Sequence, residues 1–162
     1  MMYKKRYTKE QVLQKLKHYR AYQERSISDV RGKLFELRVS KNYHNEMIQS
    51  LAENNILNEK RFAIAFATGK FRINQWGKIK IRYELKQKKI NEEYIKVALQ
   101  QIDQKSYEAI LNSMAKEKYD SLKTEQYLIR KKKTLDHLLQ KGYEADLIIK
   151  IISQLTGKAK AQ

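Results

Sequence analysis

Residues 59–100 read EKRFAIAFATGKFRINQWGKIKIRYELKQKKINEEYIKVALQ, and two apolar patterns in this stretch decide the fold. The first places apolar residues at positions i, i+1 and i+4, the spacing of one helix face: Phe62, Ala63 and Phe66. The second repeats that spacing with two pairs: Tyr94, Ile95, Ala98 and Leu99. The whole chain of 162 residues has no proline and only five glycines, so residues that interrupt helices are absent or rare. Near-continuous helix is therefore expected.

Both patterns recur about 50 residues away on either side of this stretch. The first returns twice: Val12, Leu13 and Leu16, and again Ile110, Leu111 and Met114. The second also returns twice: Met47, Ile48, Leu51 and Ala52, and again Leu147, Ile148, Ile151 and Ile152. Two independent markers with one period indicate three structural repeats. Each repeat has room for three helices of about 11–12 residues.

We therefore predict an all-α fold of three tandem three-helix repeats that form an elongated, curved array. The expected repeats and tails are residues 8–56, 57–102 and 103–155, with flexible basic tails at 1–7 and 156–162. The expected helices are 9–24, 27–40, 44–54, 59–70, 77–88, 92–101, 104–118, 124–140 and 144–155. Side chains that cap helix N-termini precede several of them: Thr8, Ser26, Asn58 and Asn91.

One segment, residues 79–85, fits two structures. Apolar and charged residues alternate there with period two, which is typical of a strand. The same apolar residues are also i, i+4 neighbours on a helix. The repeat pattern favours the helix, because Ile81 lies 14 residues before Ile95, as Leu34 does before Ile48.

The charge predicts the kind of partner. The chain carries 35 Lys and Arg against 18 Asp and Glu, a formal net charge of +17, which favours a polyanion or an acidic protein surface. The absence of cysteine excludes disulfides and cysteine-ligated metal sites. The longest apolar run, residues 62–67, is too short to span a membrane, and the first residues lack the apolar segment of a signal peptide. We expect a cytoplasmic protein without membrane contact.

A search for catalytic chemistry finds little. The three histidines are far apart in sequence and lack metal-ligand spacing: His18, His44 and His137. The glycines form no phosphate-binding loop. The tripeptide Glu84-Leu85-Lys86 resembles a nuclease strand motif, but a solvated helix explains it better. We therefore expect no enzyme activity, no catalytic residues, no metal and no cofactor.

Basic residues remain as the candidate functional feature. Between residues 70 and 89 there are eight cations and one acid, with Trp76 among them, and further runs lie at residues 4–6 and 130–133. The candidate residues for binding a polyanionic filament or DNA are Arg61, Lys78, Lys80, Arg82, Lys86, Lys88, Lys89, Arg130, Lys131, Lys132 and Lys133. Trp76 is either a packing anchor or a base-stacking platform. Phe62, Phe66 and Ile81 are core candidates.

The residues of the middle repeat resemble the RecX regulatory family. The central match is Ile56-Leu57-Asn58-Glu59-Lys60-Arg61-Phe62-Ala63, then Trp76-Gly77-Lys78-Ile79-Lys80-Ile81, Glu84-Leu85 and Lys88-Lys89-Ile90. Flanking signatures lie at residues 23–34 and 138–143. Two positions depart from the family pattern: Asn58 stands where an Asp is usual, and Lys89 stands where a Gly is frequent.

The resemblance implies a function. RecX proteins have three tandem three-helix repeats and are cytoplasmic, non-enzymatic modulators of the RecA recombinase in bacterial DNA repair. They bind the RecA–single-stranded-DNA filament, and usually inhibit strand exchange, ATP hydrolysis and co-protease activity. We expect a monomer that contacts RecA, single-stranded DNA and double-stranded DNA. A stand-alone basic protein that binds nucleic acid without a recombinase is the alternative, and a metal-dependent nuclease that uses Glu84 is a third.

Overall fold

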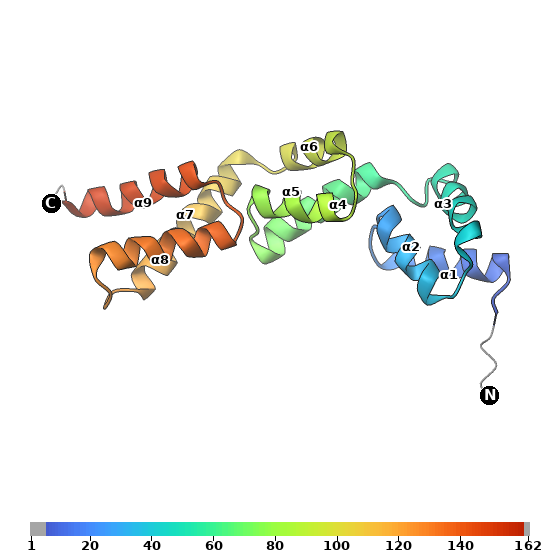
Figure 1. Ribbon diagram of the computed structural model, residues 1–162. Helices are drawn as coiled ribbons and strands as arrows, with labels where there is room; N and C mark the ends of the chain where they lie inside the picture. The colour runs from blue at the N-terminus through green and yellow to red at the C-terminus, as the bar shows by residue number, and fades with distance from the viewer. Residues whose placement is uncertain (1–5, 161–162) are drawn as a thin grey trace, which may run out of the picture. The chain divides into compact units, whose positions relative to one another are not determined.

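A computed structural model describes residues 6–160 of the chain, with side chains up to Gly157, and every regular element in this part is helical (Figure 1). The chain divides into two compact units. Unit 1 holds the residues up to Phe66 together with Leu85–Ala98, and unit 2 holds the remainder. Three helices supply residues to both units: α4 (Glu59–Asn74), α5 (Lys78–Gln87) and α6 (Glu92–Gln100). The all-α class is confirmed, and the middle repeat is shared between the units.

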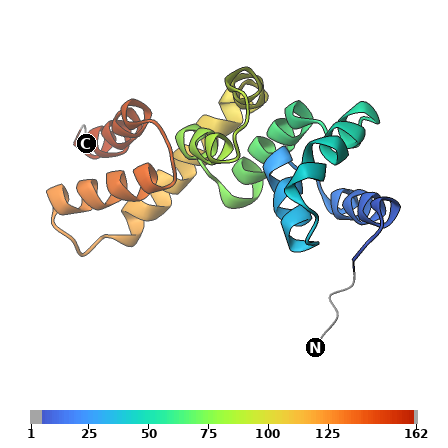
Figure 2. The ribbon, with the colours of Figure 1, turned by 45° about the vertical axis from the view of Figure 1, so that its right-hand side comes forward.

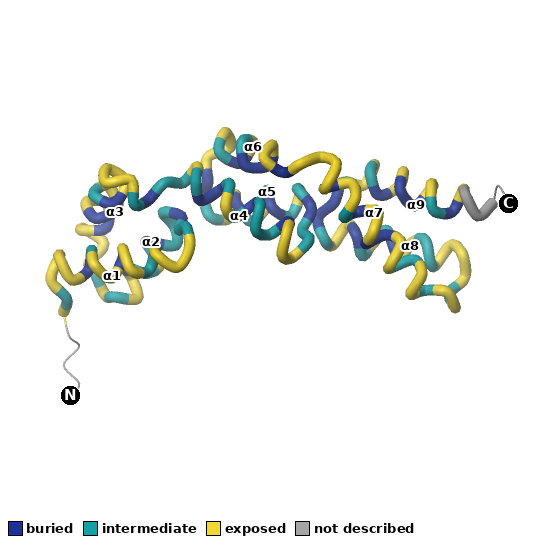
Figure 3. The backbone as a smooth tube through the Cα atoms, turned by 180° about the vertical axis from the view of Figure 1, so that it is seen from behind, coloured by how far each residue is buried: buried dark blue, intermediate teal, exposed yellow. Residues whose placement is uncertain are grey.

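Unit 1 begins with three helices that pack around one core. They are α1 (Lys9–Tyr22), α2 (Ile27–Glu36) and α3 (His44–Glu53), with a 3-10 turn, η1 (Lys41–Tyr43), before α3. The core is aliphatic: Val12, Leu16, Val30, Leu34, Met47, Ile48, Leu51 and Leu57. In Figure 3 buried and exposed stretches alternate along the helices of this unit, as expected for amphipathic helices.

The expected caps begin the helices of this unit. Thr8 and Ser26 each form a capping box, with Gln11 and Asp29 respectively. Asn58 stands where an Asp is usual, and it still caps α4. Its Oδ1 accepts a hydrogen bond from the Arg61 amide at 2.9 Å.

Unit 2 contains the third repeat. Its helices α7 (Gln104–Ser121), α8 (Tyr127–Gln140) and α9 (Ala145–Lys160) pack against one another in pairs, and Figure 2 shows them together. The sequence placed the start of the C-terminal tail at residue 156, but helix α9 continues through Lys160. Thr156 is buried there and its hydroxyl donates to the Ile152 carbonyl at 3.0 Å. The other expected tail residues, 1–5 and 161–162, lie outside the described residues.

The ambiguous segment is helical, as the repeat pattern predicted. Ile81 and Leu85 have 0% exposure on one face of α5, whereas Ile79 and Tyr83 are 53% and 59% exposed on another. Each pair is separated by four residues, so one helix produces both pairs. The period-two alternation therefore reflects two helix faces.

The second helix of every repeat ends in the same turn. After a residue with positive φ, an amide donates back to a buried leucine carbonyl: Val39 to Leu34 at 3.0 Å, Ile90 to Leu85 at 3.1 Å and Tyr143 to Leu138 at 3.2 Å. This is the Schellman arrangement of a helix C-terminus. The preceding residues are Arg38 (φ 61°), Lys89 (φ 60°) and Gly142 (φ 95°), so Lys89 keeps the turn in which the family often has glycine.

The structure corrects the alignment of the repeats in two places. The turns give the first correction, and the helix N-caps give the second. Leu34 corresponds to Leu85, and not to Ile81, because the first repeat contains the additional residues of η1 before its third helix. In the first helix of each repeat, the residue four positions after the N-cap occupies the same place. It is Val12 in the first repeat, Phe62 in the middle one and Tyr107 in the third. The third copy of the first pattern is therefore centred on Tyr107 and Leu111, one turn earlier than predicted. Phe62 and Ile81 are buried as expected, and Phe66 is half-buried.

The middle repeat docks on the third through two glycines of unit 2. The Gly77 amide donates to the Lys141 carbonyl at 2.7 Å, and the Ile79 amide donates to the Gly142 carbonyl at 3.0 Å. A Cβ atom on Gly77 would lie 2.2 Å from the Gly142 oxygen, closer than any real contact. Glycine is therefore required at residue 77 by backbone proximity.

Unit 1 contains the equivalent junction with different chemistry. The Ser28 hydroxyl donates to the Lys88 carbonyl at 2.9 Å, and the Lys88 ammonium pairs with Asp29 at 2.8 Å. The Ile27 amide donates to the Glu59 carboxylate at 3.1 Å. Burial alone would raise the pKa of Asp29, but hydrogen bonds from Lys88 and Ser26 hold it below its ordinary value.

We expect Gly77→Ala to destabilise the protein by about 2 kcal/mol or more, because the added methyl group forces the two backbones apart. Gly69→Ala is the matched control. Gly69 lies inside α4, and no atom other than those of its chain neighbours and its own helix backbone comes within 4 Å of the place where its Cβ would lie. Alanine there is therefore expected to stabilise the protein by about 0.5–1 kcal/mol. Urea denaturation followed by circular dichroism measures both. Equal midpoints for the two variants would contradict the requirement for Gly77.

Candidate functional site

Two lysine ammonium groups lie beside one tryptophan ring where α4 turns into α5. The Nζ of Lys70 is 4.9 Å from the centroid of the Trp76 ring, and the Nζ of Lys80 is 4.6 Å from it. The ring is half-buried. We call these three residues the Trp76 cluster. Both distances are within the range of cation–π attraction, about 6 Å.

The third repeat holds the backbone of this turn in place. The Tyr143 hydroxyl donates to the Gln75 carbonyl at 3.0 Å, and the Lys141 ammonium donates to the Asn74 carbonyl at 3.2 Å. Gln75 has φ of 57°, a conformation that a non-glycine residue keeps only when its surroundings enforce it. The cluster is thus presented by a rigid turn.

A buried tyrosine completes the support. The Lys78 amide donates to the Tyr107 hydroxyl at 3.0 Å, which in turn donates to the Glu144 carboxylate at 2.8 Å. Burial raises the pKa of Tyr107, and the nearby Glu144 raises it further; burial and Glu144 likewise raise the pKa of Tyr143. Both hydroxyls therefore stay protonated at neutral pH and act as donors.

The other candidates on α5 have different surroundings. The Lys78 ammonium reaches Gln104 Oε1 at 3.1 Å and lies 4.7 Å from the Tyr107 ring centroid. Arg82 is half-buried. Lys86 is exposed and pairs loosely with Glu92, at 3.7 Å.

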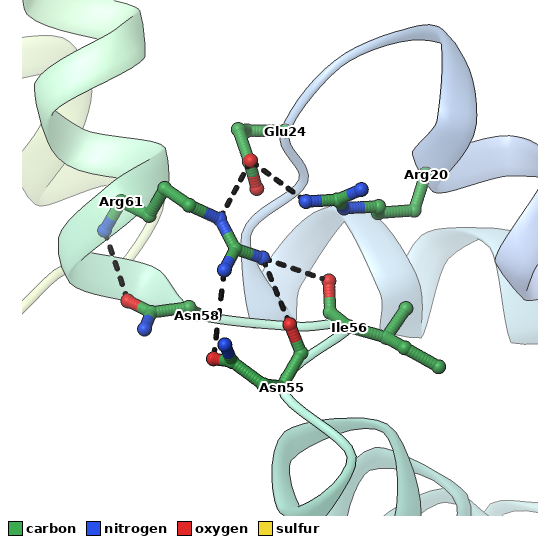
Figure 4. Close-up of polar contacts among 6 residues, drawn as sticks. All are labelled: Arg20, Glu24, Asn55, Ile56, Asn58 and Arg61. Atoms are coloured by element: carbon green, nitrogen blue, oxygen red, sulfur yellow. Dashed lines mark hydrogen bonds and ion pairs between the residues drawn. The ribbon is translucent and has the colours of Figure 1, made fainter.

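Arg61 connects three segments of unit 1 (Figure 4). Its Nε donates to Glu24 at 2.6 Å, and the same carboxylate oxygen accepts from Arg20 at 2.9 Å. One terminal nitrogen donates to the carbonyls of Asn55 at 3.2 Å and Ile56 at 3.1 Å. The guanidinium thereby joins α4 to the end of α1 and to the turn after α3, which assigns Arg61 a structural role.

Two more candidates of unit 1 lie at the junction between the first and middle repeats. Lys88 pairs with Asp29 and its ammonium is 5.7 Å from the Phe62 ring centroid, so it stabilises the junction. Lys89 is exposed in the turn after α5.

The basic run on α8 is divided among several contacts. The Arg130 Nε donates to the Tyr119 carbonyl at 2.7 Å, and its guanidinium carbon lies 3.6 Å from the Tyr119 ring centroid. Lys131 lies 5.2 Å from the Tyr127 ring centroid, Lys133 pairs with Glu125 at 2.5 Å, and Lys132 is exposed.

The Arg130 arrangement recurs in unit 1. The Arg25 Nε donates to the Tyr19 carbonyl at 3.1 Å, and its guanidinium carbon lies 3.7 Å from the Tyr19 ring centroid. Both arginines close the connection between the first and second helices of a repeat. Their charge and stacking therefore serve the fold.

The structure brings together only part of the predicted set. Lys80 lies beside Trp76 and Lys78 lies beside Tyr107 and Gln104. Four other candidates belong to unit 1: Arg61, Lys86, Lys88 and Lys89. Lys70 was not singled out as a contact residue. It lies six residues before Trp76 on a different helix from Lys80, so no helical spacing relates the two lysines. A common face for all the basic clusters stays a prediction.

Two further searches cover the part of the chain that the structure describes. It contains no group of three or more His, Asp or Glu residues that could hold a metal ion. None of its helices is long and apolar enough to cross a membrane.

Comparison with known proteins establishes the relationship. Residues 58–99 match the family description "RecX, second three-helix domain". A protein of Prosthecochloris aestuarii named "Regulatory protein RecX" is 31% identical over 137 residues, which cover 85% of this chain and 88% of that protein. The chain belongs to the RecX family. A Bacillus cytotoxicus relative of the same name is 28% identical over 130 residues, and the chain spans about half of its length, 48%.

Solved RecX structures share the fold. The crystal structure of RecX from Lactobacillus salivarius has a TM-score of 0.79 and 24% identity, covering 91% of this chain and 96% of that one. A second RecX crystal structure has a TM-score of 0.80 and 21% identity, covering 88% and 70%. Three-helix repeats are therefore the RecX architecture of this chain. The relatives are named as regulatory proteins, and the name does not describe an enzyme.

We expect Arg61→Ala to lower the free energy of unfolding by about 1–3 kcal/mol, because it leaves two backbone carbonyls without their donor and the Glu24 carboxylate with Arg20 alone. Arg61→Lys should restore only part of this loss, since an ammonium cannot reproduce the planar fork. Lys60→Ala, an exposed neighbour on α4, should change the value by less than about 0.5 kcal/mol. Thermal unfolding of the three variants checks this, and wild-type stability of Arg61→Ala would contradict it.

Proposed function

We propose that this RecX-family protein binds the RecA–single-stranded-DNA filament and inhibits its strand-exchange, ATPase and co-protease activities. The proposal rests on family membership, on the net charge of +17 and on one structural observation, the Trp76 cluster. In that cluster two ammonium groups and an aromatic ring are held by a turn that the third repeat supports.

The proposed mechanism is electrostatic docking. The lysines of the cluster contact phosphates of the DNA or carboxylates of RecA within the filament. A preorganised turn binds with a smaller loss of conformational freedom than a flexible basic tail would. Once docked, the protein obstructs filament extension and strand exchange. Exposed candidates outside the cluster, Lys86, Lys89 and Lys132, are further contact residues in this proposal.

The decisive assay adds the protein to preformed RecA filaments and follows ATP hydrolysis and strand exchange. We expect the wild-type protein to inhibit both, and the Lys70→Ala/Lys80→Ala double variant to need about tenfold more protein for the same inhibition, since charged hydrogen bonds are lost. Lys80→Ala retains the Cβ that packs near Gly142.

The control removes the same charge elsewhere in unit 2. The Lys123→Ala/Lys150→Ala double variant replaces two exposed lysines and should inhibit as the wild type does. No inhibition by wild-type protein at saturation would sink the proposal. Equal weakening of both double variants would show that net charge matters and the Trp76 cluster does not.

Salt dependence distinguishes the filament from naked DNA as the target. For single strands, log Kd against log salt has a slope of about 0.7 per phosphate neutralised. If both cluster lysines contact phosphates, their replacement should reduce the slope by about 1.4, measured by fluorescence anisotropy with a labelled oligonucleotide. Tight, salt-sensitive binding to naked DNA without preference for the filament would favour a stand-alone nucleic-acid-binding protein.

A further inference from the structure

A second aromatic and basic site lies in unit 1, apart from the basic residues named as binding candidates from the sequence. A groove of about 420 Å³ opens between α1 and α2, within the size range of small-molecule sites. Its lining includes three rings, His18, Tyr19 and Tyr22, and two lysines, Lys15 and Lys33. We propose that this groove binds an unpaired nucleobase of single-stranded nucleic acid together with an adjacent phosphate.

Tyr22 supplies the stacking surface. Its side chain is 74% exposed at the end of α1, and it is held by His18. The His18 ring meets it edge-on, with centroids 5.2 Å apart and planes at 86°, and the Tyr22 hydroxyl lies 3.4 Å from His18 Nε2. An exposed ring is what base stacking requires, because every nucleobase has a π-face.

The lysines supply attraction for phosphate. Lys15 and Lys33 line the groove, and no Asp or Glu does. Lys33 pairs with Glu36 at 3.2 Å, but Glu36 points into solvent and leaves the groove basic. An acidic peptide would use only the lysines, whereas an unpaired nucleotide uses both the rings and the lysines. The lining therefore favours single-stranded nucleic acid.

Local geometry explains why these residues meet. Positions 15, 18, 19 and 22 share one face of α1, since they are spaced three and four residues apart. Tyr19 is covered by the Arg25 guanidinium at 3.7 Å and belongs to the fold, so it is a poor test position. Tyr22 is the ring that remains open.

The inference rests on the proposed function, because the RecA filament is the source of the single-stranded DNA. The test is separate, since it measures oligonucleotide binding and not filament inhibition. Fluorescence anisotropy measures the Kd for a labelled oligothymidylate and for an abasic oligomer of equal length. We expect Tyr22→Ala to weaken oligothymidylate binding by roughly 5- to 100-fold, the usual effect of losing one stacked base. Tyr22→Phe should keep most of the affinity, because the ring remains.

Two controls make the result specific. Tyr43→Ala removes another exposed tyrosine of unit 1, 56% exposed and outside the groove, and should bind as the wild type does. With the abasic oligomer, wild type and Tyr22→Ala should have the same Kd, since no base is present to stack. Circular dichroism confirms that each variant is folded.

Other outcomes overturn the inference. Equal oligothymidylate affinity for wild type and Tyr22→Ala excludes base stacking in the groove. Unchanged DNA binding with weaker inhibition of RecA filaments would show that the groove docks a protein. Conversely, Tyr22-dependent DNA binding without any filament inhibition by wild-type protein would overturn the proposed function and leave this site standing.

Discussion

The contact between Gly77 and Gly142 is the constraint on which unit 2 depends. Two backbones approach there so closely that neither position has room for a side chain, and their amides and carbonyls pair directly. The same contact fixes the start of α5, and with it the turn that carries Trp76 and the position of Lys80. Fold and candidate site are therefore determined by one junction, and the basic cluster is a by-product of how two repeats meet.

The junction of unit 1 shows that the geometry matters more than the residues that produce it. There the second helix of the first repeat meets the turn after α5 through Ser28, Asp29 and Lys88. An ion pair and a hydroxyl take the place of glycine proximity, and Lys89 adopts the conformation that Gly142 adopts in unit 2. Net charge alone would suggest that these cations bind a partner. Several of them instead hold neighbouring repeats together. Arg61 also joins two repeats, whereas Arg130 joins two helices within the third repeat.

The sequence predicted the helices and their number per repeat because amphipathic spacing and N-caps are local signals, as at Thr8 and Ser26. It misplaced the register at Tyr107, because a tyrosine there replaces the aliphatic residue of the first copy and is recognisable only from its partners Lys78 and Glu144. The pairing of Lys70 with Lys80 and the contacts of Arg61 depend on chain reversals and backbone carbonyls. The charge of a residue in the sequence shows neither where the chain reverses nor which carbonyls the side chain contacts. The sequence therefore predicted that the candidate site is basic and aromatic, but not which residues lie together in it.

The sharing of α4, α5 and α6 between the two units has a consequence for how such a chain can be shortened or lengthened. Removal of the third repeat at its sequence boundary would uncover Phe71, whose ring packs against Tyr107 of that repeat. Truncated forms would therefore need a polar terminal cap to remain soluble, as in solenoid proteins. The unit that recurs in this architecture is the junction between two neighbouring repeats. A single repeat cut out of the chain would therefore be an incomplete fold.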